Sequence, residues 1–173
     1  MPENLPFDSD DFEEPPAFFP KDIGRGSGGL GSPVRVKVEG VYSTEEMGTI
    51  HRYVQLEDDA GRVLPMSIGP FEALAIHMAL ENSPTQRPLT HDLMRNLLDK
   101  LDGRLDRVVI DDLWNQTYYA KLYVHTKSGE VEIDCRPSDA IALALRTDSK
   151  IYVMDSILDG GFDDEGADDE EER

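Results

Sequence analysis

The chain has 173 residues, of which 36 are acidic and 17 are basic, so its formal net charge at neutral pH is −19. No stretch approaches the roughly 18 apolar residues of a membrane span, and the single cysteine excludes an intramolecular disulfide framework. The charge also disfavours a broad basic surface for nucleic acid phosphates. We therefore expect one domain with its own core and no membrane association.

Acidic residues are concentrated at the two ends of the chain. Residues 1–32 contain seven acids and end in the glycine-rich stretch GRGSGGLGS, and residues 159–173 contain nine acids. Such composition predicts disordered tails around an ordered domain that covers residues 33–158. The acidic, proline-rich first residues are unlike a signal or transit peptide, and together with the lone Cys135 they lead us to expect a cytoplasmic protein.

The first half of the domain reads as three strands followed by two helices. Alternating apolar residues predict strands over 34–42, 49–58 and 62–68, the last with Pro65 as the mark of an edge or a bulge. Gly69 and Pro70 suit a helix start, and the apolar residues of 70–82 predict a largely buried helix. A second helix over 91–103 has Thr90 as its expected N-cap.

The second half returns to strands and closes with a helix. Strands are predicted over 105–113, 118–126 and 130–135. A helix follows from Ser138 to about residue 146, then a strand over 150–154 and a helical turn over 155–160. Grouped strands with inserted helices favour a single-domain α+β fold, with a mostly antiparallel or mixed sheet and three main helices.

Two helix starts share an unusual chemistry. The stretches RPLTHDL (87–93) and CRPSDAI (135–141) both place Arg-Pro before a hydroxyl residue that precedes Asp in the first helical turn. In one interpretation Thr90 and Ser138 cap their helices, Asp92 and Asp139 complement the helix dipoles, and Arg136 pairs with Asp139. In the other, Arg136 and the free N–H groups of the helix hold a phosphate or carboxylate.

The first-turn residues of the three main helices could form one polar cluster. His91 could serve as a general base or a metal ligand, and Glu72 lies three residues after Gly69, near another helix entrance. If the helix starts converge, Glu72, His91, Asp92, Arg136 and Asp139 form a set that can hold Mg²⁺ or Mn²⁺ together with a phosphodiester. The familiar phosphate-loop, zinc-cysteine and serine-hydrolase motifs are absent from the sequence.

The motifs LPMSIGPFEALAIHMALE, RPLTHDLMRNLL, TYYAKLYV and EIDCRPSDAIALALR together resemble the bifunctional nuclease domain family over about residues 34–158. The resemblance implies a compact α+β domain, an oligomer, and activity on DNA and RNA. The family's shared polar residues fall on Gly69, Glu72, Arg87, Thr90, His91, Asp92, Arg136, Ser138 and Asp139. The chain departs from the pattern at Cys135, where a small residue is usual, and at Gln116, where glycine is expected.

Two functions stay open at this point. As a metal-assisted nuclease of DNA or RNA, the protein would use Asp92, Asp139 and Glu72 as Mg²⁺ or Mn²⁺ ligands and His91 as base or fourth ligand. Arg87 and Arg136 would bind the phosphate, with Thr90 and Ser138 beside them. The alternative is a non-catalytic, homo-oligomeric module that binds an anionic ligand, a nucleotide or a protein partner.

Overall fold

The computed structural model describes residues 31–160, which form seven strands and four helices. The strands are β1 (Pro33–Glu46), β2 (Thr49–Asp58), β3 (Val63–Ser67), β4 (Arg104–Trp114), β5 (Thr117–Thr126), β6 (Gly129–Cys135) and β7 (Lys150–Met154). The helices are α1 (Pro70–Leu80), α2 (Thr90–Lys100), α3 (Pro137–Thr147) and α4 (Asp155–Gly160). The predicted tails lie outside the described residues, except at positions 31, 32, 159 and 160.

All seven strands belong to one mixed sheet in the order β3-β2-β1-β7-β4-β5-β6. Neighbouring strands are antiparallel, apart from β4 and β7, which run parallel. Strand β7, the last of these seven in the sequence, therefore lies in the middle of the sheet and joins its two halves. Strand β3 is an edge, as Pro65 predicted, since a proline on an edge interrupts no hydrogen-bond ladder.

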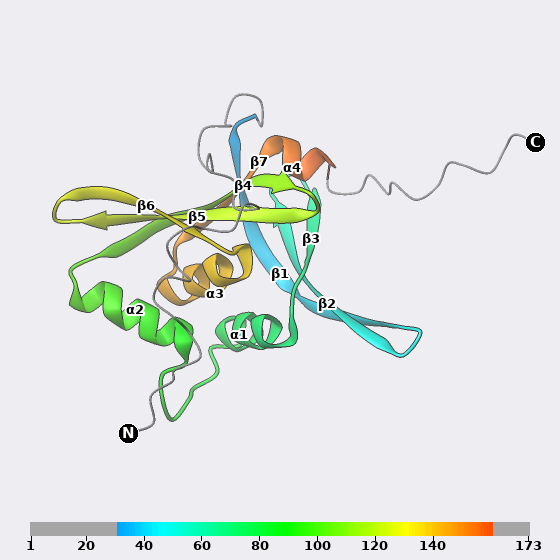
Figure 1. Ribbon diagram of the computed structural model, residues 1–173, viewed down its shortest axis with the longest axis horizontal. Helices are drawn as coiled ribbons and strands as arrows, with labels where there is room; N and C mark the ends of the chain where they lie inside the picture. Colours follow the sequence, from blue (N-terminus) through cyan, green and yellow to red (C-terminus); the bar gives the residue numbers. More distant parts are fainter. Residues whose placement is uncertain (1–30, 161–173) are drawn as a thin grey trace, which may run out of the picture.

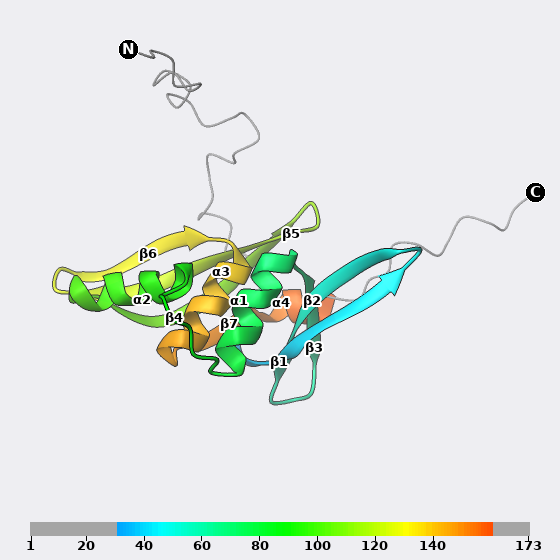
Figure 2. The same cartoon turned by 90° about the horizontal axis from the view of Figure 1, so that it is seen from below.

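Helices α1, α2 and α3 cover one face of the sheet, and α4 lies on its other side (Figure 1). The view from below shows α3 between α1 and α2 (Figure 2). The core lies between these helices and the sheet, and its fully buried side chains include Leu56, Leu64, Ile76, Ile110 and Ile141. Each such side chain contributes about 1.5–3 kcal/mol by leaving water. The predicted α+β class, mixed sheet and three main helices are confirmed.

The prediction of a largely buried α1 is wrong. The helix buries Ala73 and Ile76, whereas Phe71 is 82% exposed and Leu74 is 54% exposed. Small residues on α1 and the buried alanines of α3 let the two helices pack closely against each other. The larger apolar residues of α1 therefore lie on its outer side. The apolar stripe of α2 is also divided, because Leu98 packs on the core while Leu97 is 51% exposed.

None of the helices within residues 31–160 is both long and apolar enough to span a membrane.

Candidate active site

The starts of α1, α2 and α3 meet in a chain of hydrogen bonds through four side chains. The Arg136 guanidinium donates from Nη1 to Glu72 Oε1 (3.0 Å) and from Nε to Asp139 Oδ2 (2.7 Å). Its Nη2 donates to Asp139 Oδ1 (3.2 Å), and His91 Nε2 lies 3.1 Å from that same oxygen. Residues from three separate stretches of sequence thus form one cluster, Glu72–Arg136–Asp139–His91, which we call the four-residue cluster.

Two of the expected helix caps lie one or two residues earlier than the sequence suggested. Arg136, not Ser138, is the N-cap of α3, because Pro137 takes the first helical position and the residue before a proline is held extended. Leu89, not Thr90, is the N-cap of α2, and its N–H donates to Asp92 Oδ2 (2.9 Å). Neither hydroxyl makes a side-chain cap hydrogen bond, so the prediction that these two residues cap the helices is wrong.

Gly69 begins α1 as expected and leaves room for Glu72. A Cβ atom at Gly69 would clash with the Glu72 carboxylate, which folds back over the start of the helix. Glu72 makes no side-chain cap hydrogen bond there, and its carboxylate is turned to Arg136 instead. The glycine therefore serves to bring a carboxylate from α1 to the guanidinium of α3.

The electrostatics of the cluster keep Asp139 ionised. Partial burial acts to raise the pKa of this carboxyl, but hydrogen bonds from Arg136 and His91 outweigh burial and hold its pKa below the usual range. His91 is 8% exposed, and its ring is held by Asp139. Because an ionised carboxylate can only accept, Nε2 is the donor of this hydrogen bond, and in the neutral imidazole Nδ1 then has a lone pair. This is the orientation of a histidine that can take up a proton at Nδ1.

Asp92 points away from the cluster and into the contact between three helices. Arg146 of α3 donates to Asp92 Oδ1 (2.7 Å), to the carbonyl oxygen of Ala142 (2.8 Å) and to that of Ala75 in α1 (3.1 Å). The Arg146 side chain is 6% exposed and that of Asp92 is 21% exposed. Burial acts to raise the pKa of Asp92, but the Leu89 N–H and Arg146 outweigh it and lower that pKa. This pair ties α1, α2 and α3 together.

The other predicted binding residues are placed less centrally. Arg87 and Thr90 are exposed, Arg87 in the loop before α2 and Thr90 at the first position of that helix. Ser138 is 9% exposed and lines a cavity of about 320 Å³ beside the cluster. Glu72 and Arg136 also line this cavity, across from Gln116 and Tyr118 of the β4–β5 hairpin. Gln116 and Tyr118 were not predicted as site residues, because no local signal in the sequence shows that the hairpin reaches the helix starts.

Glu72, Asp92 and Asp139 do not fit a metal ion in this arrangement. Arg136 lies between the first and the third of these carboxylates, and Arg146 holds the second. Within residues 31–160, a different group, Asp106, His125 and Glu130, places three ligand atoms within 4.8 Å of one another. Glu72, Asp92 and Asp139, the predicted ligands of Mg²⁺ or Mn²⁺, therefore do not form a preformed ligand set.

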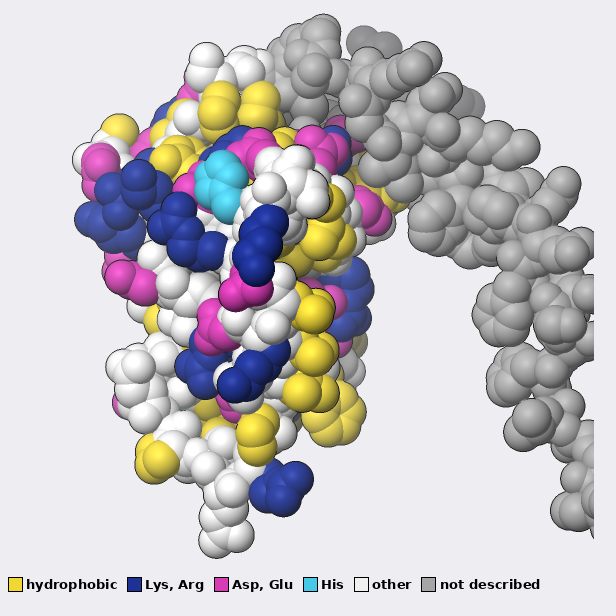
Figure 3. Space-filling model, turned by 90° about the vertical axis from the view of Figure 1, so that its left-hand side faces the viewer, with side chains coloured by type: hydrophobic (Ala, Val, Ile, Leu, Met, Phe, Trp, Pro, Cys, Tyr) yellow, Lys and Arg dark blue, Asp and Glu magenta, His cyan; other side chains and the backbone are white. Residues whose placement is uncertain are grey.

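Two other features limit the chemistry of the site. Burial, together with neighbouring carboxylates, raises the pKa of the Cys135 thiol to about 12, which disfavours a thiolate nucleophile. On the face of the molecule in Figure 3, basic and acidic side chains are intermixed and no broad basic surface forms. In the cluster itself, the guanidinium of Arg136 is the group that can hold an anion.

Comparison with known sequences places the chain in a family. The bifunctional nuclease domain model matches residues 54–161. An uncharacterized protein of Mycobacterium tuberculosis is 40% identical over 102 residues, which is 59% of this chain and 60% of that protein. Bifunctional nuclease 2 of Arabidopsis thaliana is 28% identical over 123 residues, which is 65% of this chain and 37% of that protein. Bifunctional nuclease 1 of the same plant is 28% identical over 103 residues, 58% of this chain and 32% of that protein.

The chain thus spans less than two thirds of the length of each of these relatives. The family match covers β2 to α4, and so contains every residue of the four-residue cluster and the Asp92–Arg146 pair. The chain belongs to the bifunctional nuclease domain family.

Proposed function

We propose that the protein is a nuclease that hydrolyses phosphodiester bonds of DNA or RNA at the four-residue cluster. One observation carries the proposal: three helix starts bring an imidazole, two carboxylates and a guanidinium into one hydrogen-bonded chain, and Glu72 and Arg136 of this chain line a cavity. Family membership, and the names of the plant relatives, support the choice of a phosphodiester over other substrates.

Arg136 is the proposed phosphate ligand. Its side chain is 66% exposed and lines the cavity, so that a phosphoryl oxygen can reach the guanidinium while Asp139 continues to hold Nε. A positioned guanidinium stabilises the charge that develops on the phosphoryl oxygens in the transition state. Removing one such donor typically costs on the order of 100- to 1,000-fold in rate.

His91 is the proposed general base, with Asp139 as the residue that positions it. Asp139 fixes the ring through Nε2 and leaves Nδ1 to accept a proton from the attacking water. Glu72 holds Arg136 from the α1 side and is the second carboxylate next to the cavity. The expected metal ligands are engaged by arginines, so the proposed roles fall to protein groups. Dependence of cleavage on Mg²⁺ or Mn²⁺ stays a prediction.

The test compares purified wild-type protein with Arg136→Ala and with Arg104→Ala, which removes an exposed arginine from β4 as a matched control. Each is incubated with labelled single-stranded RNA and DNA, with Mg²⁺, with Mn²⁺ and with a chelator. We expect cleavage by the wild type and by Arg104→Ala, and a loss of roughly 100-fold or more in Arg136→Ala. Equal cleavage by all three proteins would refute the assignment of Arg136.

The alternative function is a non-catalytic module that binds an anionic ligand, a nucleotide or a protein partner. Its support is that Arg136 already donates three hydrogen bonds to two carboxylates and that the His91 side chain is 10% exposed. An internally satisfied cluster of this kind could bind without turnover. Absence of cleavage by the homogeneous wild-type protein under all of these conditions would favour this module.

A homo-oligomer is proposed for either function. Its support is a set of exposed apolar side chains on the outer faces of α1 and α2, Phe71, Leu74, Leu93, Leu97 and Leu101, since large exposed apolar patches mark interaction surfaces. Light scattering of the purified protein should give a mass above the 19.4 kDa of one chain, and a monomer at all concentrations would refute the oligomer. The expected cytoplasmic location also stays a prediction.

A further inference from the structure

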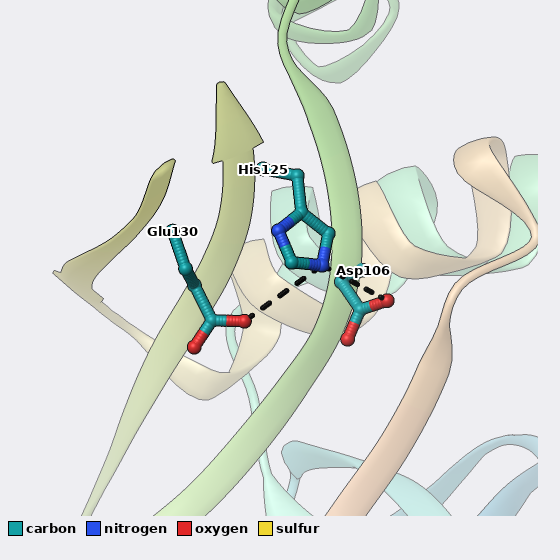
Figure 4. Close-up of side chains that lie close together, drawn as sticks. All are labelled: Asp106, His125 and Glu130. Carbon is teal, nitrogen blue, oxygen red and sulfur yellow. Dashed lines mark ion pairs between the residues drawn. The ribbon is translucent and has the colours of Figure 1, made fainter. Parts of the chain in front are cut away.

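Three potential metal ligands meet on the sheet, far along it from the starts of the helices. Asp106 of β4, His125 of β5 and Glu130 of β6 come from three neighbouring strands (Figure 4). His125 is directly opposite Glu130 in the β5–β6 pair and opposite Arg104 in the β4–β5 pair. The adjacent Val124 and Leu105 point into the core under the helices, so His125 projects from the opposite face of the sheet.

A β-bulge adds the third ligand to this face. The β4–β5 register shifts between Leu105 and Arg107, which makes Asp106 an extra residue in β4. Strict alternation would put Asp106 and Arg107 on opposite faces, whereas a bulge redirects a side chain. Both side chains do lie on one face, since Arg107 Nη1 donates to Asp106 Oδ2 (2.9 Å). The bulge thereby brings the Asp106 carboxylate next to His125.

The distances are close to those around a bound ion. His125 Nε2 lies 3.7 Å from Asp106 Oδ1 and 3.9 Å from Glu130 Oε2, and all three ligand atoms lie within 4.8 Å of one another. Ligand atoms at about 2.1 Å from a tetrahedral Zn²⁺ ion are separated by about 3.4 Å. The side chains of Asp106, His125 and Glu130 are 35%, 46% and 37% exposed, so each can make the small rotation required.

Arg107 would compete with such an ion for the carboxylates of Asp106 and Glu130. It donates to Asp106 Oδ2, to Glu130 Oε2 (2.9 Å) and to Glu130 Oε1 (3.2 Å), and its guanidinium lies 4.0 Å from the centre of the Tyr123 ring. Asp106 Oδ1 carries none of these bonds, and a carboxylate oxygen has a second lone pair for an ion at Glu130 Oε2. Arg107 can therefore stay bound to Asp106 Oδ2 and Glu130 Oε1, as partners of metal-bound carboxylates do, and it would share Glu130 Oε2 with the ion.

The charge of the group suits a divalent ion. The two acidic side chains of the group, Asp106 and Glu130, both accept hydrogen bonds from Arg107. Two carboxylates and one arginine contribute a net charge of −1 beside the imidazole of His125. Imidazole nitrogen selects Zn²⁺ and related transition metals over Mg²⁺, which prefers an all-oxygen shell.

We propose that Asp106, His125 and Glu130 form a binding site for a divalent transition-metal ion of the Zn²⁺ type. Water fills the remaining coordination positions, because the group is open to solvent. The ion would tie β4, β5 and β6 together. Within residues 31–160, β6 is the edge strand on this side of the sheet. The site is separate from the four-residue cluster and does not depend on the proposed nuclease activity.

The test is calorimetric titration of the full-length, metal-free protein with Zn²⁺ in the presence of excess Mg²⁺. Co²⁺ absorption in the visible range reports nitrogen ligation independently. The variants are His125→Ala and Glu130→Gln, and His51→Ala is the matched control, since His51 is an exposed strand histidine outside the group. Far-UV circular dichroism and thermal unfolding check that each variant keeps the fold.

We expect saturable Zn²⁺ binding with one ion per chain in the wild type, in His51→Ala and in Arg136→Ala. His125→Ala and Glu130→Gln should each weaken it at least tenfold, because losing even an outer-shell partner costs about 10- to 100-fold in affinity. Unchanged affinity in folded His125→Ala would overturn the proposal and assign the binding to acidic residues elsewhere. The absence of saturable binding by the wild type would also overturn it. Failure of the nuclease assay has no bearing on either result.

Discussion

Replacing Arg146 with alanine should destabilise the protein strongly, even though no catalytic role is proposed for this residue. The Arg146 side chain is 6% exposed and donates to Asp92 Oδ1 and to two carbonyl oxygens from α1 and α3. Breaking a buried ion pair typically costs about 3–5 kcal/mol, because one charge is left unpaired. Since Asp92 keeps 21% exposure, we expect a loss near the lower end, about 3 kcal/mol of unfolding free energy.

Urea unfolding followed by far-UV circular dichroism measures this loss, and a thermal scan should show a melting temperature lower by about 10 °C. Arg136→Ala is the matched control, since it removes the same side chain from a position that is 66% exposed, where ion pairs contribute about 0–1 kcal/mol. A loss below about 1 kcal/mol in Arg146→Ala would refute the view that this pair holds the three helices together.

The pair also has a defined pH dependence. The pKa of Asp92 is lower in the folded protein than in the unfolded chain. Its contribution to stability is therefore complete above the unfolded value of about 3.9 and is lost as the pH falls through the lower folded value. The difference in unfolding free energy between the wild type and Asp92→Asn should be constant near pH 7 and shrink below about pH 4. A difference that grows on acidification would contradict this assignment.

Three further predictions concern the hairpin turns and the cysteine. Gln116→Gly should raise the free energy of unfolding in urea by about 1 kcal/mol, because Gln116 has a φ of 59°, in the left-handed region that favours glycine. The control Gln55→Gly, at a position within strand β2, should not raise it. Asp58→Ala should lower the urea midpoint more than the exposed Asp59→Ala, since Asp58 accepts from the N–H groups of Ala60 and Arg62; equal effects would argue against that turn. Cys135 should react with a thiol reagent at neutral pH far more slowly in the native protein than after urea unfolding, and equally rapid labelling of both would contradict its partial burial and raised pKa.

The strands could be predicted from the sequence to within a few residues, because a half-buried strand carries its pattern in alternate residues. The place of β7 could not, since nothing local indicates that the last strand inserts between β1 and β4. The exposed side of α1 was also hidden: a helix with apolar residues all around, such as Phe71 and Ile76, does not indicate which side meets its neighbour.

The candidate site could likewise be predicted from the sequence only in part. Glu72, His91, Arg136 and Asp139 could be predicted as residues at the helix starts, and their meeting depends on helix packing that the sequence leaves open. The partner of Asp92 was not predicted, because Arg146 lies 54 residues away. A basic residue in the last turn of a helix is common, so Arg146 gave no sign of a specific partner. Asp106, His125 and Glu130 were missed because their convergence depends on strand register and on one bulge.

The N-cap of α3 was predictable by a rule already applied at α1. Pro70 follows the N-cap Gly69, and Pro137 follows the N-cap Arg136 in the same way. A hydroxyl side chain after the proline, such as Ser138, is then already inside the first turn and is buried there.

The most direct test of the central claim compares cleavage by Asp139→Asn with cleavage by Asp92→Asn, at a temperature where circular dichroism shows both to be folded. The two aspartates occupy the same first-turn position in their helices, but only Asp139 contacts His91 and Arg136. Asp139→Asn should lose roughly 100-fold or more of the cleavage rate, and Asp92→Asn should keep the wild-type rate while unfolding more easily. Full activity in Asp139→Asn, or its loss in folded Asp92→Asn, would contradict the assignment of catalysis to the four-residue cluster.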